Sequence, residues 1–468
     1  MSVKKHRESG NPIDYQSRSV LYGLFRHIMM FGVRCHYKRL YIHGKENMPK
    51  GGSYIMAPCH QQTVMDAFLM LKITPKSPVF LTRADIFSTK IIQKTRAFLR
   101  IMPVYRIRDG AGELKKNVEV FESCKDVLMH GIPLCMMAEG RHNNRHHLLP
   151  LGKGISRIAC ETQKLMGNQP LFIVPIGIDY DTYERPYGNV VVNIGKPIAV
   201  QPFMVSYEGN EAQIYNDIRE RLAEAMKSLM LDINSEEHYE EIYTLCDVLN
   251  KREREKMGVR DSIWNRFLAR QRIACRMDKM EDGDKFNTLM GLIKRYSSLC
   301  AGLRLDYRIP GEHWGVFTTV ASFLLCVASV FVTVSIPVIR LSALFWMLCY
   351  PIALVPTSLL FKRMQIDPQF KSSFNFIFRY VFSILYSIVI GIVLTKTNGL
   401  WMSGIVDIGG WWGLVSLALV VLGAALSGQV ISWVRKVMEN GFYWLLRLFK
   451  RNKMKELETL LDEMNVII

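Results

Sequence analysis

The sequence of 468 residues has ten cysteines, and no two of them form a C-x-x-C pair. This spacing argues against a zinc ribbon and against a disulfide framework, so reduced thiols in a reducing compartment are expected. The first residues, MSVKKHRESGNPIDYQSRS, lack the apolar run of a cleaved signal peptide. The chain also lacks internal repeats and low-complexity tracts, which argues against a solenoid repeat protein and against long segments of biased composition.

Acidic residues are scarce relative to basic ones. Aspartate and glutamate number 42 against 60 lysines and arginines, which gives a formal net charge of +18. A basic surface attracts anions such as nucleic acid, acidic lipid and phosphorylated substrates. No nucleic-acid recognition motif is present, so we expect anionic lipid and phosphate as partners and no nucleic acid.

Residues 39–205 are predicted to form one α/β domain. Short apolar runs rich in β-formers alternate there with helical stretches, and several runs are apolar on both faces, as in strands buried between helices. The predicted strands are RLYIHG from Arg39, Ser53–Pro58, Pro78–Arg83, Met102–Ile107, Pro133–Glu139, Leu171–Ile178 and Asn189–Gly195.

Two segments beside this domain carry no catalytic signature. Residues 1–38 comprise a polar tail and an apolar stretch interrupted by Arg26, His27 and Arg34. That stretch fits either a helix lying in a bilayer interface or an amphipathic helix packed on the domain. Residues 206–310 are highly charged with helical periodicity and are predicted to be a helical segment that serves as scaffold or connector.

The last third is predicted to be a bundle of about four transmembrane helices within residues 311–434. Four apolar stretches are each long enough to cross a bilayer: Trp314–Ile339, Leu341–Phe361, Phe376–Leu394 and Trp411–Trp433. The distribution of lysine and arginine places the α/β domain and both termini of this multi-pass protein in the cytoplasm. Residues 435–468 form a basic, amphipathic tail that could lie on a membrane surface.

The stretch APCHQQTVMDAFL places His60 and Asp66 between a predicted strand and a predicted helix. A histidine at such a turn can take a proton from an alcohol while a carboxylate fixes its tautomer. Taken alone this signal is weak, because a histidine and an aspartate occur this close together by chance in many proteins.

A second stretch, MMAEGRHNNRHHLLPLGKGISRIA, adds a glycine-containing loop that is dense in cations and follows a strand. Glu139, Gly140, Arg145 and Lys153 lie in it, and such a loop suits a phosphate. It is not a Walker loop, because LGKGIS lacks the earlier glycine and the Lys-Ser/Thr pair. The loop also holds His142, His146 and His147, but their spacing matches no common ligand set, so no metal is predicted.

Two further features complete the pattern. FLRIMPVYRIRDG places Arg106 just past a short strand, where its guanidinium could bind a phosphate through two hydrogen bonds. FIVPIGIDY contains Pro175 inside an apolar strand, which favours an edge strand or a bulge near a site.

Taken in order, these four blocks resemble the glycerolipid acyltransferase superfamily over roughly residues 39–198. The resemblance implies an α/β acyltransferase domain with His60 as general base and Asp66 as its partner. It also implies that Arg106, Glu139, Gly140, Arg145 and Lys153 serve the substrate phosphate and that Pro175 lines the acyl site. The acyl donor would be acyl-CoA or acyl carrier protein, the acceptor glycerol 3-phosphate or 1-acylglycerol 3-phosphate, and no further cofactor is implied.

One departure concerns the interval between the two catalytic candidates. The family's histidine and aspartate are usually separated by four residues, whereas five separate His60 from Asp66. Either Gln61 occupies the place of the base, which would leave the site inactive, or the turn is enlarged and His60 keeps its role. Fungal-type glycerol-3-phosphate acyltransferases look similar in this interval, which favours an active enzyme. The alternatives are acylation of another lysolipid or amino-acid lipid, or an inactive lipid-binding membrane protein.

Overall fold

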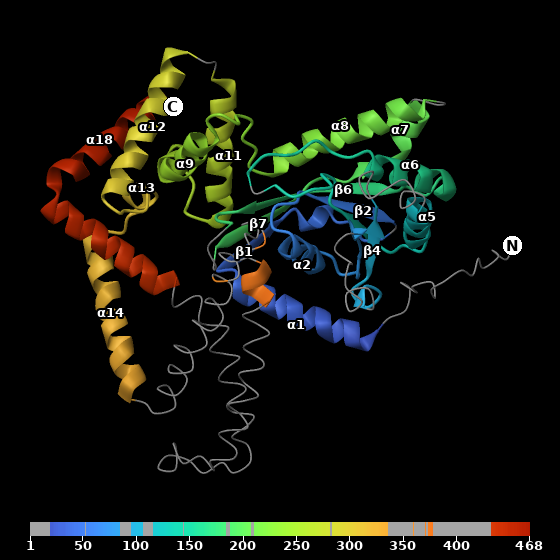
Figure 1. Cartoon of the computed structure of the whole chain (residues 1–468), viewed down its shortest axis with the longest axis horizontal. Coiled ribbons are helices and arrows are strands. Elements are labelled where there is room, and N and C mark those ends of the chain that lie inside the picture. The colour runs from blue at the N-terminus through green and yellow to red at the C-terminus, as the bar shows by residue number, and fades with distance from the viewer. Residues whose placement is uncertain are drawn as a thin grey trace, which may run out of the picture.

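A computed structural model describes residues 19–51, 53–84, 95–105, 116–143, 145–183, 188–206, 210–280, 283–335, 359, 370, 373–377 and 432–468. Figure 1 shows an α/β unit with a helical unit beside it. Each unit has its own cluster of buried apolar side chains. The sheet carries the functional candidates, and the helical unit covers one end of it.

The sheet has eight strands in the order β1-β7-β6-β2-β5-β3-β4, with β8 paired to β6. The seven predicted strands are present, and β8 is the addition. Strands β6 and β7 are antiparallel, as are β6 and β8, and the other pairs are parallel. The strands are β1 (Arg39–His43), β2 (Tyr54–Pro58), β3 (Val79–Arg83), β4 (Ile101–Val104), β5 (Leu134–Met136), β6 (Phe172–Tyr180), β7 (Asn189–Ile194) and β8 (Ile198–Ala199).

Helices cover both faces of this sheet (Figure 1). On one side lie α1 (Val20–His36) and α2 (Val64–Ile73); on the other lie α5 (Lys116–Met129), α6 (Gly154–Met166) and α8 (Glu211–Leu229), with the short α7 (Gln201–Ser206). The α8 end approaches β6 closely at Gly177, where a Cβ atom would lie 2.1 Å from the Leu229 carbonyl oxygen. A glycine is required there because any side chain would push the helix off the sheet.

Pro175 lies in an interior strand, so of the two predicted settings, an edge strand or a bulge near a site, the edge strand is excluded. Strand β6 runs between β7 and β2, and Pro175 is buried opposite Ala57 of β2. Proline has no backbone N–H, and this is tolerated because the antiparallel partner of β6 changes from β8 to β7 at Pro175. Strand β8 pairs with Phe172 and Ile173, and β7 pairs from Ile176 onward.

The helical unit packs around the second apolar cluster. It contains α9 (Tyr239–Val248), α10 (Asn250–Lys256), α11 (Ile263–Lys279), α12 (Asp284–Gly302), α13 (Ile309–Glu312), a helix over 432–449 and α18 (Arg451–Ile467). The apolar face of α18, including Leu457 and Leu460, is buried against this cluster. That part of the basic tail therefore packs on protein rather than lying on a membrane surface.

The predicted transmembrane bundle, and the multi-pass topology derived from it, are wrong. Among the described residues no helix combines the length and apolarity that a membrane crossing needs. The first predicted span begins at Trp314, which precedes α14 (Val316–Ser335) and bonds to the helix over 432–449: its N–H donates to Asn440 and its carbonyl accepts from Trp444. The second span, except Leu359, and most of the third and fourth lie outside the described residues.

The start of the third predicted span is buried in protein. Phe376 is 2% exposed within the core of the α/β unit, and its ring lies against those of His36 and Phe68. Apolar character in the sequence therefore reflects burial against the α/β unit at this position. Hydropathy alone does not distinguish burial in a protein core from membrane crossing.

Candidate active site

The candidate site lies where the parallel strands β2, β5 and β6 end. In α/β sheets, ligands bind beyond the carboxyl ends of the strands. Strand β2 ends at Pro58 and leads through Cys59 to His60, while its neighbour β5 leads to Glu139. Its other neighbour, β6, ends at Tyr180. The topology thus brings together groups that are more than 100 residues apart in the chain.

His60 and Asp66 are paired. The Nδ1 atom of His60 lies 2.9 Å from Oδ2 of Asp66, and the histidine side chain is 14% exposed while the aspartate is fully buried. The same Oδ2 accepts the N–H groups of Gln61 at 2.9 Å and Gln62 at 2.8 Å. Oδ1 accepts the hydroxyl of Tyr180. These donors replace the hydrogen bonds to water that the fully buried carboxylate has lost.

Gln61 does not take the place of the base. Its side chain is 1% exposed, and its amide has no hydrogen-bond partner among the described residues. Only its backbone N–H reaches Asp66. The side chain that contacts Asp66 across the five-residue interval is that of His60.

Thr63, in the same turn, has an unusual backbone conformation. Its backbone has φ 45° and ψ −111°, a region that is costly for a β-branched side chain. Its hydroxyl lies 2.8 Å from that of Ser373, and Ser373 also donates to the Gln62 carbonyl at 3.4 Å. A segment 310 residues away thus fixes the turn that carries His60.

Glu139 holds the backbone of the site together. Its Oε1 accepts the N–H of His60 at 2.8 Å, and its Oε2 accepts the N–H of Leu149 at 3.0 Å. Burial raises the pKa of the Glu139 carboxyl to about 7, although both N–H groups favour the charged form. Gly140 follows with φ +65°, a conformation that favours glycine and turns the chain back. In this arrangement Glu139 fixes the backbone at His60 and at Leu149.

Two of the three predicted cations, Arg145 and Lys153, lie within the described residues. Arg145 is exposed, with its guanidinium 4.9 Å from the ring centroid of Tyr239 in α9. Lys153 is exposed at the start of α6, where the helix dipole favours an anion. Arg106 lies outside the described residues. The structure therefore brings His60, Asp66, Glu139 and Gly140 together, and the phosphate contacts stay a prediction.

Two residues at the site were missed by sequence reasoning. Tyr180 is fully buried and donates to Asp66; it ends the FIVPIGIDY run, which was noted for its proline. His142 was considered only as a metal ligand, yet its Nδ1 lies 2.8 Å from Nε2 of His60. The strand order supplies the signal for both, because it places the ends of β5 and β6 beside β2.

The other two histidines of the loop are involved in structural contacts. The N–H of His146 donates to the Tyr239 hydroxyl at 2.8 Å, and its Nε2 lies 3.2 Å from Oδ1 of Asp179. His147 lies 3.1 Å from Asp232, and this hydrogen bond raises the pKa of the His147 imidazole. His146 thus ties the loop to α9 of the helical unit. His147 ties it to the segment that connects α8 to α9.

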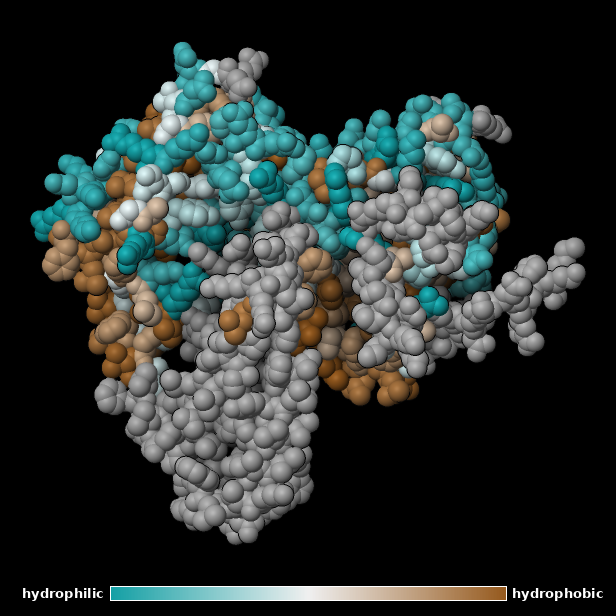
Figure 2. Space-filling view, viewed as in Figure 1, coloured by the Kyte–Doolittle hydropathy of each residue, from teal (hydrophilic) through white to brown (hydrophobic). Residues whose placement is uncertain are grey.

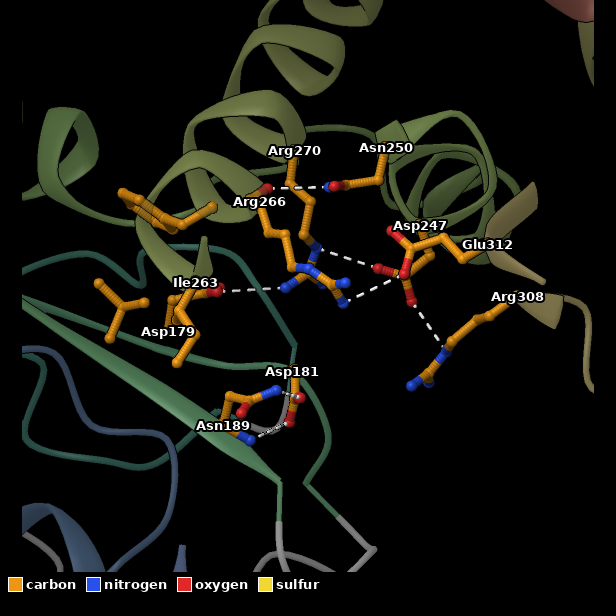
Figure 3. A pocket seen from close by; sticks show the side chains of 12 residues that line it. Asp179, Asp181, Asn189, Asp247, Asn250, Ile263, Arg266, Arg270, Arg308 and Glu312 are labelled. Atoms are coloured by element: carbon orange, nitrogen blue, oxygen red, sulfur yellow. Dashed lines mark hydrogen bonds and ion pairs between the residues drawn. The ribbon is translucent and has the colours of Figure 1, made fainter. Parts of the chain in front are cut away.

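A polar cavity of about 100 Å³ lies behind the site, between β6, β7 and the helical unit (Figure 3). Arg270 of α11 is 4% exposed and lies 3.1 Å from both Asp179 of β6 and Asp247 of α9. Arg308 reaches Asp247 at 3.1 Å. Burial would raise the pKa of Asp179, but Arg270 and His146 outweigh it and hold the pKa below its usual value. Asp179, which directly precedes Tyr180, is thus anchored to the helical unit.

Comparison with known proteins agrees with this geometry. Residues 39–179 match the family model described as Acyltransferase. The α/β unit is thus similar to the acyltransferase family over these residues. The matched range contains His60, Asp66 and the loop from Glu139, which lie together at the strand ends. The match extends to the family model as a whole and does not assign the fungal-type branch.

Solved structures that are similar to the chain were also found. The 1-acyl-sn-glycerophosphate (LPA) acyltransferase PlsC from Thermotoga maritima is similar over 46% of this chain and 84% of that chain, at 18% identity and a TM-score of 0.33. A search among curated proteins found no match.

Proposed function

We propose that the acyltransferase domain transfers a fatty acyl group from an acyl thioester to a hydroxyl of glycerol 3-phosphate or 1-acylglycerol 3-phosphate. The observation that carries the proposal is the His60–Asp66 pair, in which a buried carboxylate with four donors orients one imidazole. This is the arrangement that general-base activation of a hydroxyl requires.

The proposed reaction uses the chain's own side chains. Nε2 of His60 takes the proton of the acceptor hydroxyl, and the hydroxyl oxygen attacks the thioester carbonyl carbon. The carbon–sulfur bond then breaks, and the imidazolium returns the proton to the departing thiolate. Asp66 accepts the Nδ1–H of His60 throughout, which orients the ring and stabilises the imidazolium.

Basic residues around the loop would bind the acceptor phosphate. Arg145 and Lys153 are both exposed and free of ion pairs to described residues, and Arg106 is a third candidate. Holding the phosphate would bring the hydroxyl close to His60 and lower the entropic part of the barrier. The donor would be acyl-CoA or acyl carrier protein, whose anionic groups suit the basic chain.

We further propose that α1 contacts a phospholipid surface. Val20, Leu24, Ile28 and Phe31 are 89%, 59%, 47% and 48% exposed and follow one another at helical spacing. The opposite face packs on the domain through Tyr22, Val33 and His36. Figure 2 shows apolar surface along the lower rim, where Figure 1 places α1. An apolar stripe of this kind suits shallow insertion at a lipid interface.

The test is acyl transfer from labelled palmitoyl thioester by the full-length protein, with glycerol 3-phosphate and 1-acylglycerol 3-phosphate offered separately. We expect activity in the wild type and in Gln61→Ala, and none above background in His60→Ala. Arg145→Ala should raise the KM of a phosphate-bearing acceptor. If the wild type were inactive with every acceptor and both donors, the lipid-binding alternative would replace this proposal. An unchanged KM in Arg145→Ala would favour an acceptor without phosphate.

A further inference from the structure

The acceptor nitrogen of the proposed base is already occupied. Nδ1 of His142 lies 2.8 Å from Nε2 of His60, and the two rings meet at 61° with centroids 4.5 Å apart. Both side chains are half-buried. Nε2 is the atom that must accept the proton of the acceptor hydroxyl, so this contact lies on the reaction coordinate of the proposed reaction.

The donors around Asp66 fix the direction of this hydrogen bond. Asp66 accepts from Gln61, Gln62 and Tyr180, so its carboxylate also accepts from His60 and Nδ1 of His60 carries a proton. In a neutral imidazole the other nitrogen, Nε2, then has the lone pair. His142 must therefore donate its Nδ1–H to it. One in-plane lone pair accepts one such hydrogen bond, so His142 and an acceptor hydroxyl exclude each other.

The loop that carries His142 is tied to His60 by the backbone. The N–H of Asn143 donates to the His60 carbonyl at 3.0 Å, and Glu139 accepts the His60 N–H. The ring of Phe370 lies edge-on to that of His142, with centroids 5.6 Å apart. The backbone at His142 is thus held beside the base. Rotation about the side-chain torsions of His142 would turn its imidazole away from the base.

We propose that His142 gates the base: it occupies Nε2 of His60 until an acceptor hydroxyl displaces it, and so suppresses hydrolysis of the acyl thioester. This rests on the proposed function. Without the gate, a water at Nε2 would lose its proton to His60 and attack the thioester carbonyl. The carbon–sulfur bond would break, and the thiolate would take the proton back, giving fatty acid and free thiol. His142 is in this sense a specificity-determining residue.

The first experiment measures thiol release from palmitoyl-CoA without acceptor. The proteins are the wild type, His142→Ala, His142→Asn and His130→Ala, whose exposed histidine contacts its own helix at Asp126. We expect His142→Ala to hydrolyse about fivefold faster, the factor that one neutral hydrogen bond supplies. Asparagine places an N–H donor where Nδ1 stands, so His142→Asn should stay near the wild type, as should His130→Ala. Unchanged hydrolysis in His142→Ala, or equal rates in the alanine and asparagine variants, overturns the gate.

A second readout does not depend on the reaction. Diethyl pyrocarbonate modifies an imidazole nitrogen through its lone pair, so we expect the peptide containing His60 to be modified severalfold faster in His142→Ala than in the wild type or in His142→Asn. Equal modification rates overturn the gate. If thermal unfolding shows that His142→Ala does not fold, His142→Leu replaces it, because leucine keeps the volume and lacks the donor.

The two readouts separate the gate from the proposed function. An absence of acyl transfer in the wild type counts against the function, whatever the modification rates show. Transfer in the wild type together with equal modification rates retains the function and removes the gate.

Discussion

Tyr180 supplies the hydrogen bond that completes the shell of donors around Asp66. Replacing it with phenylalanine keeps the ring but leaves Oδ1 of a fully buried carboxylate without that donor. We expect kcat/KM for acyl transfer to fall about tenfold, since a hydrogen bond to a charged group contributes roughly 1.5–3 kcal/mol and part of that loss is shared with stability. Steady-state kinetics of Tyr180→Phe measure this.

Tyr183 offers a matched control for this prediction. It is packed near Tyr180, with ring centroids 6.0 Å apart, and its buried hydroxyl has no hydrogen-bond partner in the described part of the chain. Tyr183→Phe should therefore leave kcat/KM unchanged and leave the unfolding temperature equal or higher. Equal losses in the two variants would show that ring packing, rather than the hydrogen bond to Asp66, matters at Tyr180.

Glu139 should make stability depend on pH. Burial moves the pKa of its carboxyl from 4.5 to about 7 in the folded protein. Between these values the folded protein binds a proton that the unfolded chain has lost, so stability falls as the pH rises from about 4.5 to 7. The full effect is of the order of 3 kcal/mol. Urea unfolding of the wild type and Glu139→Gln across this range measures it.

The difference between these two proteins isolates Glu139, because other groups titrate in both. The raised pKa of His147 also lowers stability as the pH rises, but its largest cause, the hydrogen bond to Asp232, is present in both proteins. The Glu139→Gln curve should be flatter than that of the wild type. Parallel curves would mean that Glu139 is charged across the whole range in the folded protein.

At the scale of single elements, Arg26 fixes α1 to the end of α2. Its guanidinium donates to the carbonyl oxygens of Leu71 at 2.9 Å and Pro75 at 3.0 Å, and also to that of Thr74. The last carbonyls of a helix lack partners within it, so these bonds satisfy the C-terminal end of α2. Arg26→Ala should lower the free energy of unfolding by about 1–3 kcal/mol and make α1 more susceptible to limited proteolysis.

Arg34 is the control on the same helix, since it is exposed. Its replacement by alanine should change the free energy of unfolding by less than about 0.5 kcal/mol. Equal destabilisation by the two variants would mean that the loss of positive charge, and not the contact with α2, is responsible.

The elements also show what the sequence could predict. Apolar runs with flanking turn residues located the seven strands. Only five residues separate His60 from Asp66, so their pairing could be predicted from the local sequence. The order of the strands is not local, so the approach of Tyr180, 114 residues beyond Asp66, could not be inferred. Apolarity also failed to separate burial from membrane crossing at Phe376, because both call for the same side chains.

At the scale of the whole molecule, buried ion pairs connect the α/β unit to the helical unit. Arg270 lies between Asp179 and Asp247 at the wall of the cavity in Figure 3, and these acids belong to the sheet and to α9 respectively. Removing one member of a buried set leaves the remaining charges without compensation. Arg270→Met should therefore lower the free energy of unfolding by about 3–5 kcal/mol, measured by urea denaturation.

Arg295 and Glu456 provide the comparison, because they join α12 to α18 through an ion pair whose side chains are 65% and 38% exposed. Water screens this pair, so Arg295→Met should cost about 0–1 kcal/mol. If Arg270→Met destabilised no more than Arg295→Met, the charges around the cavity would be hydrated rather than mutually dependent. The larger loss that we expect, together with lower transfer activity, would instead show that the helical unit holds Asp179, and through it Tyr180, in place beside Asp66.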